Sequence, residues 1–148
     1  KLENIRHLGL VVEDLERALT FYRDLLGLHI QGKTDEKGSF ISKILATKNV
    51  EVKTVKLSAD DNSTRIELLK FNNSKTKKKI SLVEPGFTHI ALTVKNLDEL
   101  YLKLKKAGIK FNCSPTITPN ETIKILFCED FEGNYLELIE EIVEKKIS

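Results

Sequence analysis

Residues 5–12 read Ile-Arg-His-Leu-Gly-Leu-Val-Val, and residues 87–94 read Phe-Thr-His-Ile-Ala-Leu-Thr-Val. Both stretches place a histidine third and then an aliphatic residue at every second position. That alternation is typical of a strand with one buried face. Because the same pattern occurs twice along the chain, the sequence predicts two copies of one structural module.

A helix is predicted to follow each of these strands. Asp14 and Asn96 are suitable N-cap residues, and Glu99 completes a capping box with Asn96. Apolar residues then recur at helical spacing in both copies, until Gly27 and Gly108 provide C-cap positions. The two glycines are one residue out of step with the repeat, which a single deletion in the second helix would explain.

Beyond each glycine the apolar period changes to two, which predicts further strands. We expect them near residues 28–33, 51–58, 64–71, 109–113, 122–128 and 134–140. The predicted fold is α+β, with two tandem βαβββ modules whose curved mixed sheets surround a metal-binding cleft. Within one domain spanning 1–148, we expect modules at 5–71 and 87–140, a linker at 72–86 and a charged tail at 141–148.

Composition narrows the classes of function. The 148 residues carry 24 Lys and Arg against 22 Asp and Glu, with the signs interleaved, so neither nucleic acid nor a membrane is an expected partner. Four lysines at 75 and 77–79 read as a solvated linker. Cys113 and Cys128 are too far apart for a Cys-x-x-Cys site and are expected to be reduced core or strand residues. No signal peptide is visible, so a cytoplasmic protein is expected.

Four ionisable residues stand at equivalent places in the two copies. His7 and His89 begin their strands on the face opposite the helix, and Glu67 and Glu137 interrupt apolar strands on the corresponding face. A carboxylate there is costly unless a cation neutralises it. If the modules pack about a pseudo-twofold axis, all four side chains converge and bind one divalent ion, Ni, Co, Zn, Mn or Fe. Singly, each residue reads as structural or solvent-facing, and the repetition favours ligation. His29 has no counterpart and is expected at the surface.

The segments that carry these residues resemble those of a known superfamily. They are His7-Leu8-Gly9-Leu10-Val11-Val12, Leu15-Glu16-Arg17-Ala18, Phe21-Tyr22-Arg23-Asp24-Leu25-Leu26-Gly27, Ile66-Glu67-Leu68-Leu69, His89-Ile90-Ala91-Leu92 and Asp130-Phe131-Glu132-Gly133-Asn134-Tyr135-Leu136-Glu137-Leu138. Together they resemble the vicinal oxygen chelate superfamily, which includes glyoxalase I, methylmalonyl-CoA epimerase, extradiol dioxygenases and the fosfomycin and bleomycin resistance proteins.

The order His, Glu, His, Glu resembles the ligand set of bacterial-type glyoxalase I, or lactoylglutathione lyase. The resemblance implies a divalent-metal-dependent lyase or isomerase that moves a proton through an enediolate on a small carbonyl or thioester substrate. A glutathione or CoA adduct is the kind of substrate that it implies. Glu137 and Glu67 would be the catalytic carboxylates, and Arg17 would contact the glutathione part of the substrate. We expect Glu137 to be the better desolvated of the two, and Arg65 to make Glu67 the weaker base. A homodimer is expected.

Other members of the superfamily supply the alternatives. Methylmalonyl-CoA epimerases usually carry Gln where Glu67 stands, and extradiol dioxygenases use three ligands, corresponding here to His7, His89 and Glu137. A metal-dependent transferase that inactivates an antibiotic and a metal-free protein that sequesters one also remain open. The sequence leaves open, too, whether the four ligands come from one chain or from two.

Overall fold

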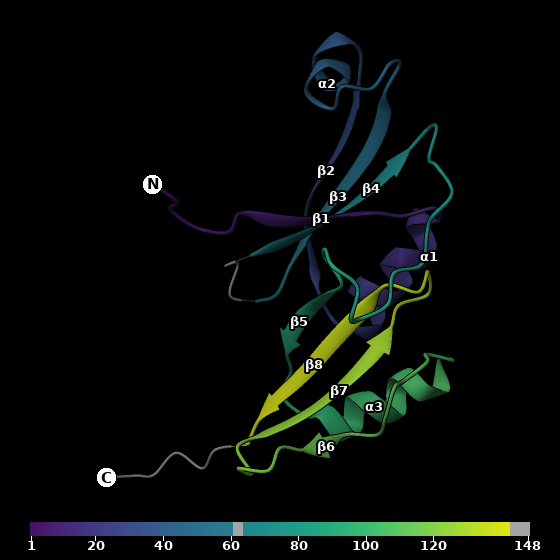
Figure 1. Ribbon diagram of the computed structural model, residues 1–148. Coiled ribbons are helices and arrows are strands. Elements are labelled where there is room, and N and C mark those ends of the chain that lie inside the picture. Colours follow the sequence, from purple (N-terminus) through teal and green to yellow (C-terminus); the bar gives the residue numbers. More distant parts are fainter. Residues whose placement is uncertain (61–63, 143–148) are drawn as a thin grey trace. The chain divides into compact units, whose positions relative to one another are not determined.

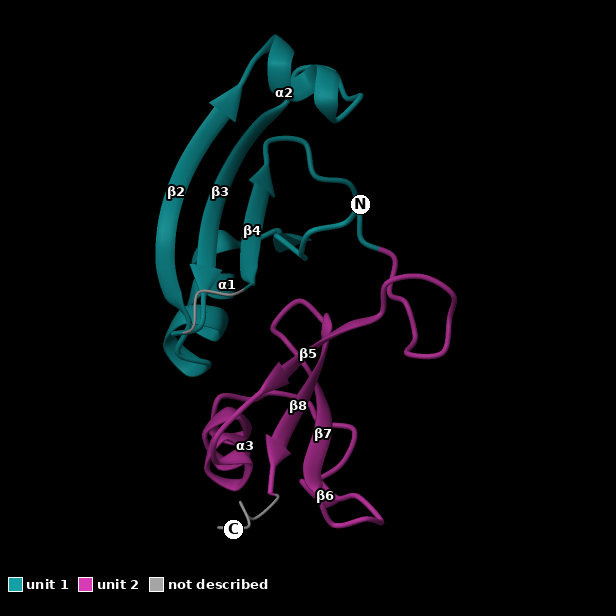
Figure 2. Cartoon of the chain, turned by 90° about the vertical axis from the view of Figure 1, so that its left-hand side faces the viewer, with its two compact units in different colours: residues 1–77 teal, residues 78–148 magenta. Residues whose placement is uncertain are grey.

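The computed structural model describes residues 1–60 and 64–142. The chain forms two compact units, Lys1–Lys77 and Lys78–Ser148, which Figure 2 shows in different colours. Their boundary lies inside the predicted linker, 72–86. Each unit is described by itself.

The first unit holds one four-stranded mixed sheet (Figure 1). Its elements are β1 (His7–Val11), α1 (Leu15–Leu19), the π-helix η1 (Thr20–Leu25), β2 (His29–Lys37), α2 (Ser39–Ile44), β3 (Glu51–Ser58) and β4 (Arg65–Phe71). The strand order is β1-β4-β3-β2, with β1 parallel to β4 and the other pairs antiparallel. The first and last strands of the unit are therefore neighbours.

The second unit repeats this arrangement. Its elements are β5 (His89–Thr93), α3 (Leu97–Lys106), β6 (Thr116–Ile117), β7 (Ile123–Glu129) and β8 (Tyr135–Glu141). The order is β5-β8-β7-β6, again with only the β5–β8 pair parallel. The predicted α+β fold of two βαβββ modules is confirmed.

Three details differ from the prediction. The strand expected at 109–113 is wrong: only Phe111 forms a bridge there, to Cys128, and the strand is β6. Asn112, Ser114 and Pro115 are turn formers, and Pro115 has no N–H to donate to a ladder. In the first unit β2 continues to Lys37, and the short helix α2 was not predicted. The predicted tail at 141–148 is partly strand, because β8 ends at Glu141, and residues 143–148 lie outside the described residues.

The first helix changes from α to π after Leu19. The amide of Leu26 donates to the carbonyl of Phe21, five residues back, at 2.9 Å. A π-turn holds one more residue than an α-turn. The extra residue of the first helix thus lies in η1. Gly27 and Gly108 therefore end their helices with the same φ of +83°, although their positions differ by one residue from the offset of the sequence repeat.

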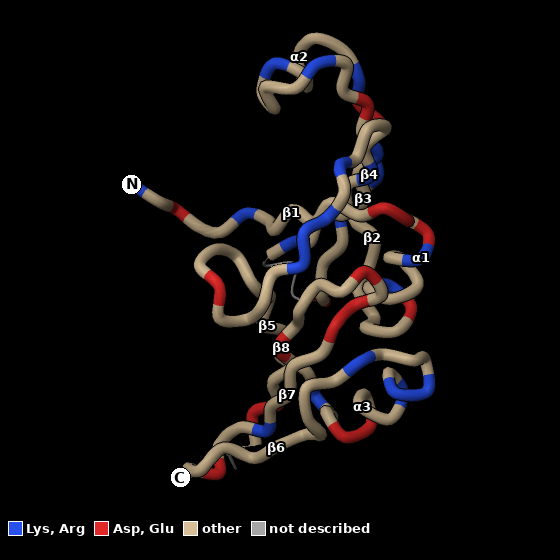
Figure 3. The backbone as a smooth tube through the Cα atoms, turned by 45° about the vertical axis from the view of Figure 1, so that its right-hand side comes forward, with Lys and Arg blue, Asp and Glu red and all other residues tan. Residues whose placement is uncertain are grey.

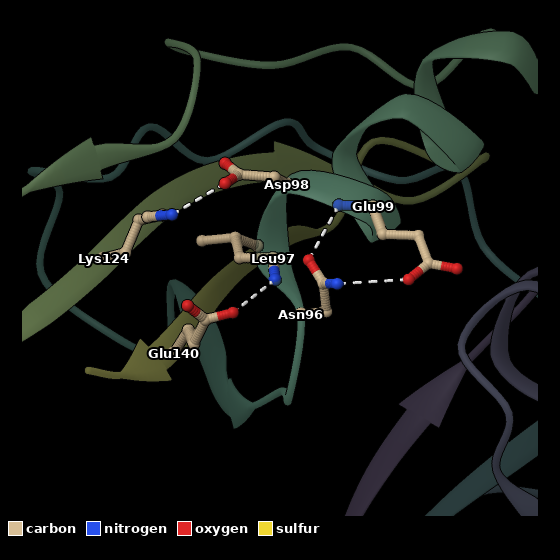
Figure 4. Close-up of polar contacts among 6 residues, drawn as sticks. All are labelled: Asn96, Leu97, Asp98, Glu99, Lys124 and Glu140. Atoms are coloured by element: carbon tan, nitrogen blue, oxygen red, sulfur yellow. Dashed lines mark hydrogen bonds and ion pairs between the residues drawn. The ribbon is translucent and has the colours of Figure 1, made fainter. Parts of the chain in front are cut away.

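The N-terminus of α3 confirms the predicted cap and adds to it (Figure 4). The amide of Glu99 donates to Asn96 Oδ1 at 3.2 Å, and Asn96 Nδ2 donates to Glu99 Oε2 at 3.2 Å. The amide of Leu97 donates to Glu140 Oε1 on β8 at 2.8 Å, and Lys124 on β7 pairs with Asp98 at 2.7 Å. The sheet therefore holds the start of the helix in place.

Each unit has its own apolar core. The largest fully buried side chains of the first include Tyr22, Phe21, Leu19, Leu57 and Leu68, and those of the second Leu97, Leu104, Leu126, Leu136 and Leu138. Along β1 and β5 burial alternates, with both histidines on the more exposed face, as predicted. None of the helices in the described part of the chain is long and apolar enough to cross a membrane. In Figure 3, segments of both charge signs occur in both units.

The two cysteines are free and differ in exposure. Cys113 is exposed in a loop rather than in the predicted strand, whereas Cys128 is buried in β7. Burial, with smaller contributions from Asp130 and Glu129, raises the pKa of Cys128 to about 12. Only the thiolate is nucleophilic, so a disulfide reagent at pH 8 should titrate one thiol per folded chain and both in guanidinium chloride. Fast reaction of both thiols in the folded chain would contradict this assignment.

Candidate metal centre

The first unit brings His7 and Glu67 together. In the parallel β1–β4 ladder His7 lies opposite Arg65, and Gly9 lies opposite Glu67. The imidazole therefore reaches diagonally to the carboxylate, and Nε2 of His7 lies 3.1 Å from Oε2 of Glu67. The pairing of the first and last strands of the unit is what creates this contact.

The second unit builds the same pair in the same register. His89 lies opposite Tyr135, Ala91 lies opposite Glu137, and Nε2 of His89 is 3.2 Å from Oε2 of Glu137. The hydroxyl of Thr88 is 2.8 Å from Nδ1 of His89. That contact fixes the orientation of the ring and leaves Nε2 directed at the carboxylate.

The surroundings of the two carboxylates differ in charge. Across the β3–β4 ladder Glu67 faces Lys56, whose Nζ lies 3.9 Å from Oε1. At the equivalent place Glu137 faces Phe127, whose ring meets that of His89 edge to face with centroids 5.0 Å apart. A cation thus accompanies one carboxylate and an aromatic ring the other.

The predicted difference in desolvation is wrong. The Glu67 side chain is 14% exposed and that of Glu137 is 19% exposed. Each carboxylate lies on a strand flanked by two others, so neighbouring side chains cover both to a similar extent. The cation paired with Glu67 among the described residues is Lys56 rather than Arg65.

His7 and Glu67 of the first unit line a pocket of about 390 Å³. Its lining residues are Asn4, Arg6, His7, Lys56, Arg65 and Glu67. Arg6 and Lys56 were not predicted as site residues. Arg6 could have been predicted, because it directly precedes His7 in the sequence. Lys56 could not, because it is placed beside Glu67 by the β3–β4 register, which the sequence does not specify.

Two other residues considered from the sequence lie elsewhere. Arg17 is exposed on α1 and is not among the residues that line this pocket, so its contact with substrate stays a prediction. His29, expected at the surface, is exposed at the start of β2, and its Nε2 lies 2.6 Å from Oδ1 of Asp60.

The residues present suit a metal in their chemistry. Each pair offers one imidazole nitrogen and one carboxylate oxygen, and two such pairs form a donor set that fits Fe, Mn, Co, Ni or Zn. Across residues 1–60 and 64–142, no three His, Cys, Asp or Glu side chains form a cluster that could hold an ion. The pairs are what the structure defines, and the four-ligand site stays a prediction.

Two curated relatives align with nearly the whole chain. One is a Bacillus subtilis protein named YwbC, 25% identical over 138 residues that cover 93% of this chain and 98% of the relative. Another, from Synechocystis sp., is named "Probable lactoylglutathione lyase" and is 28% identical over 136 residues, covering 90% and 92% of the two chains.

Solved structures share the fold. A glyoxalase family protein from Bacillus cereus superposes with a TM-score of 0.88 at 23% identity, covering 97% of each chain. The trypanothione-dependent glyoxalase I of Leishmania major gives 0.69 at 23% identity, covering 95% of this chain and 88% of that one. Residues 4–138 match the Glyoxalase/Bleomycin resistance protein/Dioxygenase superfamily. The chain with its twofold-repeated His–Glu pair therefore belongs to that superfamily.

Proposed function

We propose that this chain is a divalent-metal-dependent lyase or isomerase of the glyoxalase I type, with His7, Glu67, His89 and Glu137 as ligands of one ion. The observation that carries the proposal is the repetition of one His–Glu contact, 3.1 Å and 3.2 Å long, in identical strand registers. A salt bridge kept for stability alone has no need of this symmetry. The name of the Synechocystis relative supports the choice of reaction.

Proton transfer between neighbouring carbons is the chemistry we assign to the site. When bound, a divalent ion would supply Lewis-acid stabilisation of the charge that develops on the substrate oxygen. The carboxylate of Glu137 would take the proton from one carbon and return it to the carbon beside it. Glu67, which has Lys56 beside it, would serve as a ligand. The histidines would orient the carboxylates without moving a proton.

The test combines metal analysis with an activity screen. Protein purified without chelators or an affinity tag should hold one divalent ion per site, and should convert the hemithioacetal of methylglyoxal and glutathione into a thioester. Absence of metal together with tight binding of an antibiotic would replace this proposal with a sequestering protein. Oxygen consumption with a catechol would replace it with a dioxygenase.

A further inference from the structure

We infer that the pocket of the first unit binds an oxyanion of the substrate, a carboxylate or a phosphoryl group, through Arg6, Lys56 and Arg65. The inference rests on the proposed function, because it gives the substrate of that same site a chemical class. It is argued from the charges in the pocket, from their placement, and from the second unit, which has the same fold without them.

The pocket holds more positive than negative charge. Three permanent cations and one carboxylate line it, which leaves an excess of two positive charges when His7 is neutral. If Glu67 also gives its charge to a metal ion, the excess grows. Like charges gathered in one pocket repel each other, and a bound anion relieves that repulsion.

Within residues 1–60 and 64–142 these cations are poorly neutralised by other side chains. Lys56 is 3.9 Å from Glu67, beyond hydrogen-bond distance, and neither Arg6 nor Arg65 forms an ion pair with a described residue. Elsewhere on the described surface the chain pairs cations closely, as in Lys124 with Asp98 at 2.7 Å. Arginine guanidinium groups match the planar or tetrahedral oxygens of oxyanions through two parallel hydrogen bonds.

The strand register places this charge beside the His–Glu pair. Arg65 lies opposite His7 on the neighbouring strand, and Lys56 lies opposite Glu67 on the next. An oxyanion held by these side chains would therefore lie next to His7 and Glu67, two of the proposed metal ligands. The expected substrate carries an anionic group that reaches the first-unit His–Glu pair.

The second unit shows that the fold does not require these cations. By register, Tyr135 replaces Arg65 and Phe127 replaces Lys56, and by the sequence repeat Thr88 replaces Arg6. One ammonium, that of Lys79, lies 5.8 Å from the centre of the Tyr135 ring. It pairs with Glu129 at 2.9 Å, so its charge is already balanced. The described residues of the first unit therefore carry an unbalanced charge that their counterparts in the second unit lack. A bound ligand would explain this charge, and the fold does not require it.

The test is an NMR titration of the ¹⁵N-labelled full chain with methylphosphonate and with acetate, in the metal-free and the Zn²⁺-loaded forms. We expect saturable shifts at Arg6 and Arg65 in both forms. Arg6→Gln, Lys56→Gln and Arg65→Gln should each weaken binding about tenfold, the usual effect of losing a hydrogen bond to a charged group. The preferred anion then tells a phosphoryl from a carboxylate substrate.

Lys53→Gln is the matched control. It removes one positive charge from the same strand as Lys56, but outside this pocket, and should change binding by less than about twofold. Arg65→Lys keeps the positive charge but loses the two parallel hydrogen bonds of the guanidinium group, so it should also weaken binding. This variant provides the test if Arg65→Gln proves unstable. No saturable shift in the wild type, or equal losses with Lys53→Gln, would overturn the inference.

Metal content separates this inference from the proposed function. A chain that binds Zn²⁺ but no oxyanion retains the proposed function and loses the inference. Oxyanion binding at Arg6 and Arg65 by a chain that binds no divalent ion leaves the pocket in place and removes the metal-dependent reaction. Binding seen only with Zn²⁺ and unaffected by the three glutamine variants would place the anion on the metal and overturn the inference.

Discussion

Glu137→Gln is expected to lower kcat by at least about 100-fold, and by more than Glu67→Gln does at equal metal occupancy. An amide oxygen can still coordinate an ion but cannot accept a proton. The ammonium of Lys56 lies 3.9 Å from Glu67, whereas the aromatic ring of Phe127 faces Glu137. The choice of Glu137 as base therefore rests on the neighbouring charge, since burial of the two carboxylates is similar.

The measurement is kcat for both variants with methylglyoxal and glutathione, with metal content determined on the same samples. Glu141→Gln is the matched control, because it makes the same change on the same strand at an exposed position and should leave kcat unchanged. Equal losses at Glu67 and Glu137 would mean that the two carboxylates share the proton. A greater loss at Glu67 would reverse the assignment.

His7→Ala and His89→Ala should each lower the bound divalent metal well below one ion per site. Each substitution removes one donor of four, and water compensates poorly for a lost imidazole. Each also leaves a glutamate without its partner at about 3 Å. Glu→Gln at either carboxylate should lower metal content less, so the two kinds of substitution test ligation and basicity separately. Elemental analysis after dialysis gives the occupancy.

The chain provides its own control for this experiment. Of the three histidines, His29 is the one not assigned as a ligand. It lies at the start of β2 and pairs with Asp60 rather than with either glutamate. His29→Ala should leave the occupancy at the wild-type value. Unchanged occupancy in both His7→Ala and His89→Ala would refute the ligand assignment, as would an equal loss in all three variants.

Much of the fold could be predicted because local patterns determine it. Alternation identified the strands that carry His7 and His89, and Asx residues followed by helical spacing identified the helices. The two-residue strand β6 could not be found in this way, since it is too short to show a period. Nor could η1, because Thr20–Leu25 reads as ordinary α-helix and becomes a π-turn only to accommodate an extra residue.

The His and Glu residues of the candidate site could be predicted from the sequence, and their surroundings less so. Periodicity placed each His and Glu on one face, and the strand pairing of each unit joins them as pairs. The neighbours of Glu67 and Glu137 across the sheet depend on the register of β3 and β7, which bulges and loop lengths shift by single residues. For this reason Lys56 and Phe127 were not predicted as neighbours, and the predicted difference in burial between Glu67 and Glu137 was wrong.

The parallel pairing of the first strand of each unit with its last one also affects folding. Histidine and glutamate of a pair come from opposite ends of their unit in sequence, so neither pair can form from local contacts. A nascent chain that ends before β4 would carry an imidazole with no carboxylate beside it. Contacts between distant segments form late and slowly, so the proposed set of four ligands would be complete only when both units have closed. A metal ion that binds only the completed site would stabilise the folded chain relative to partly folded ones.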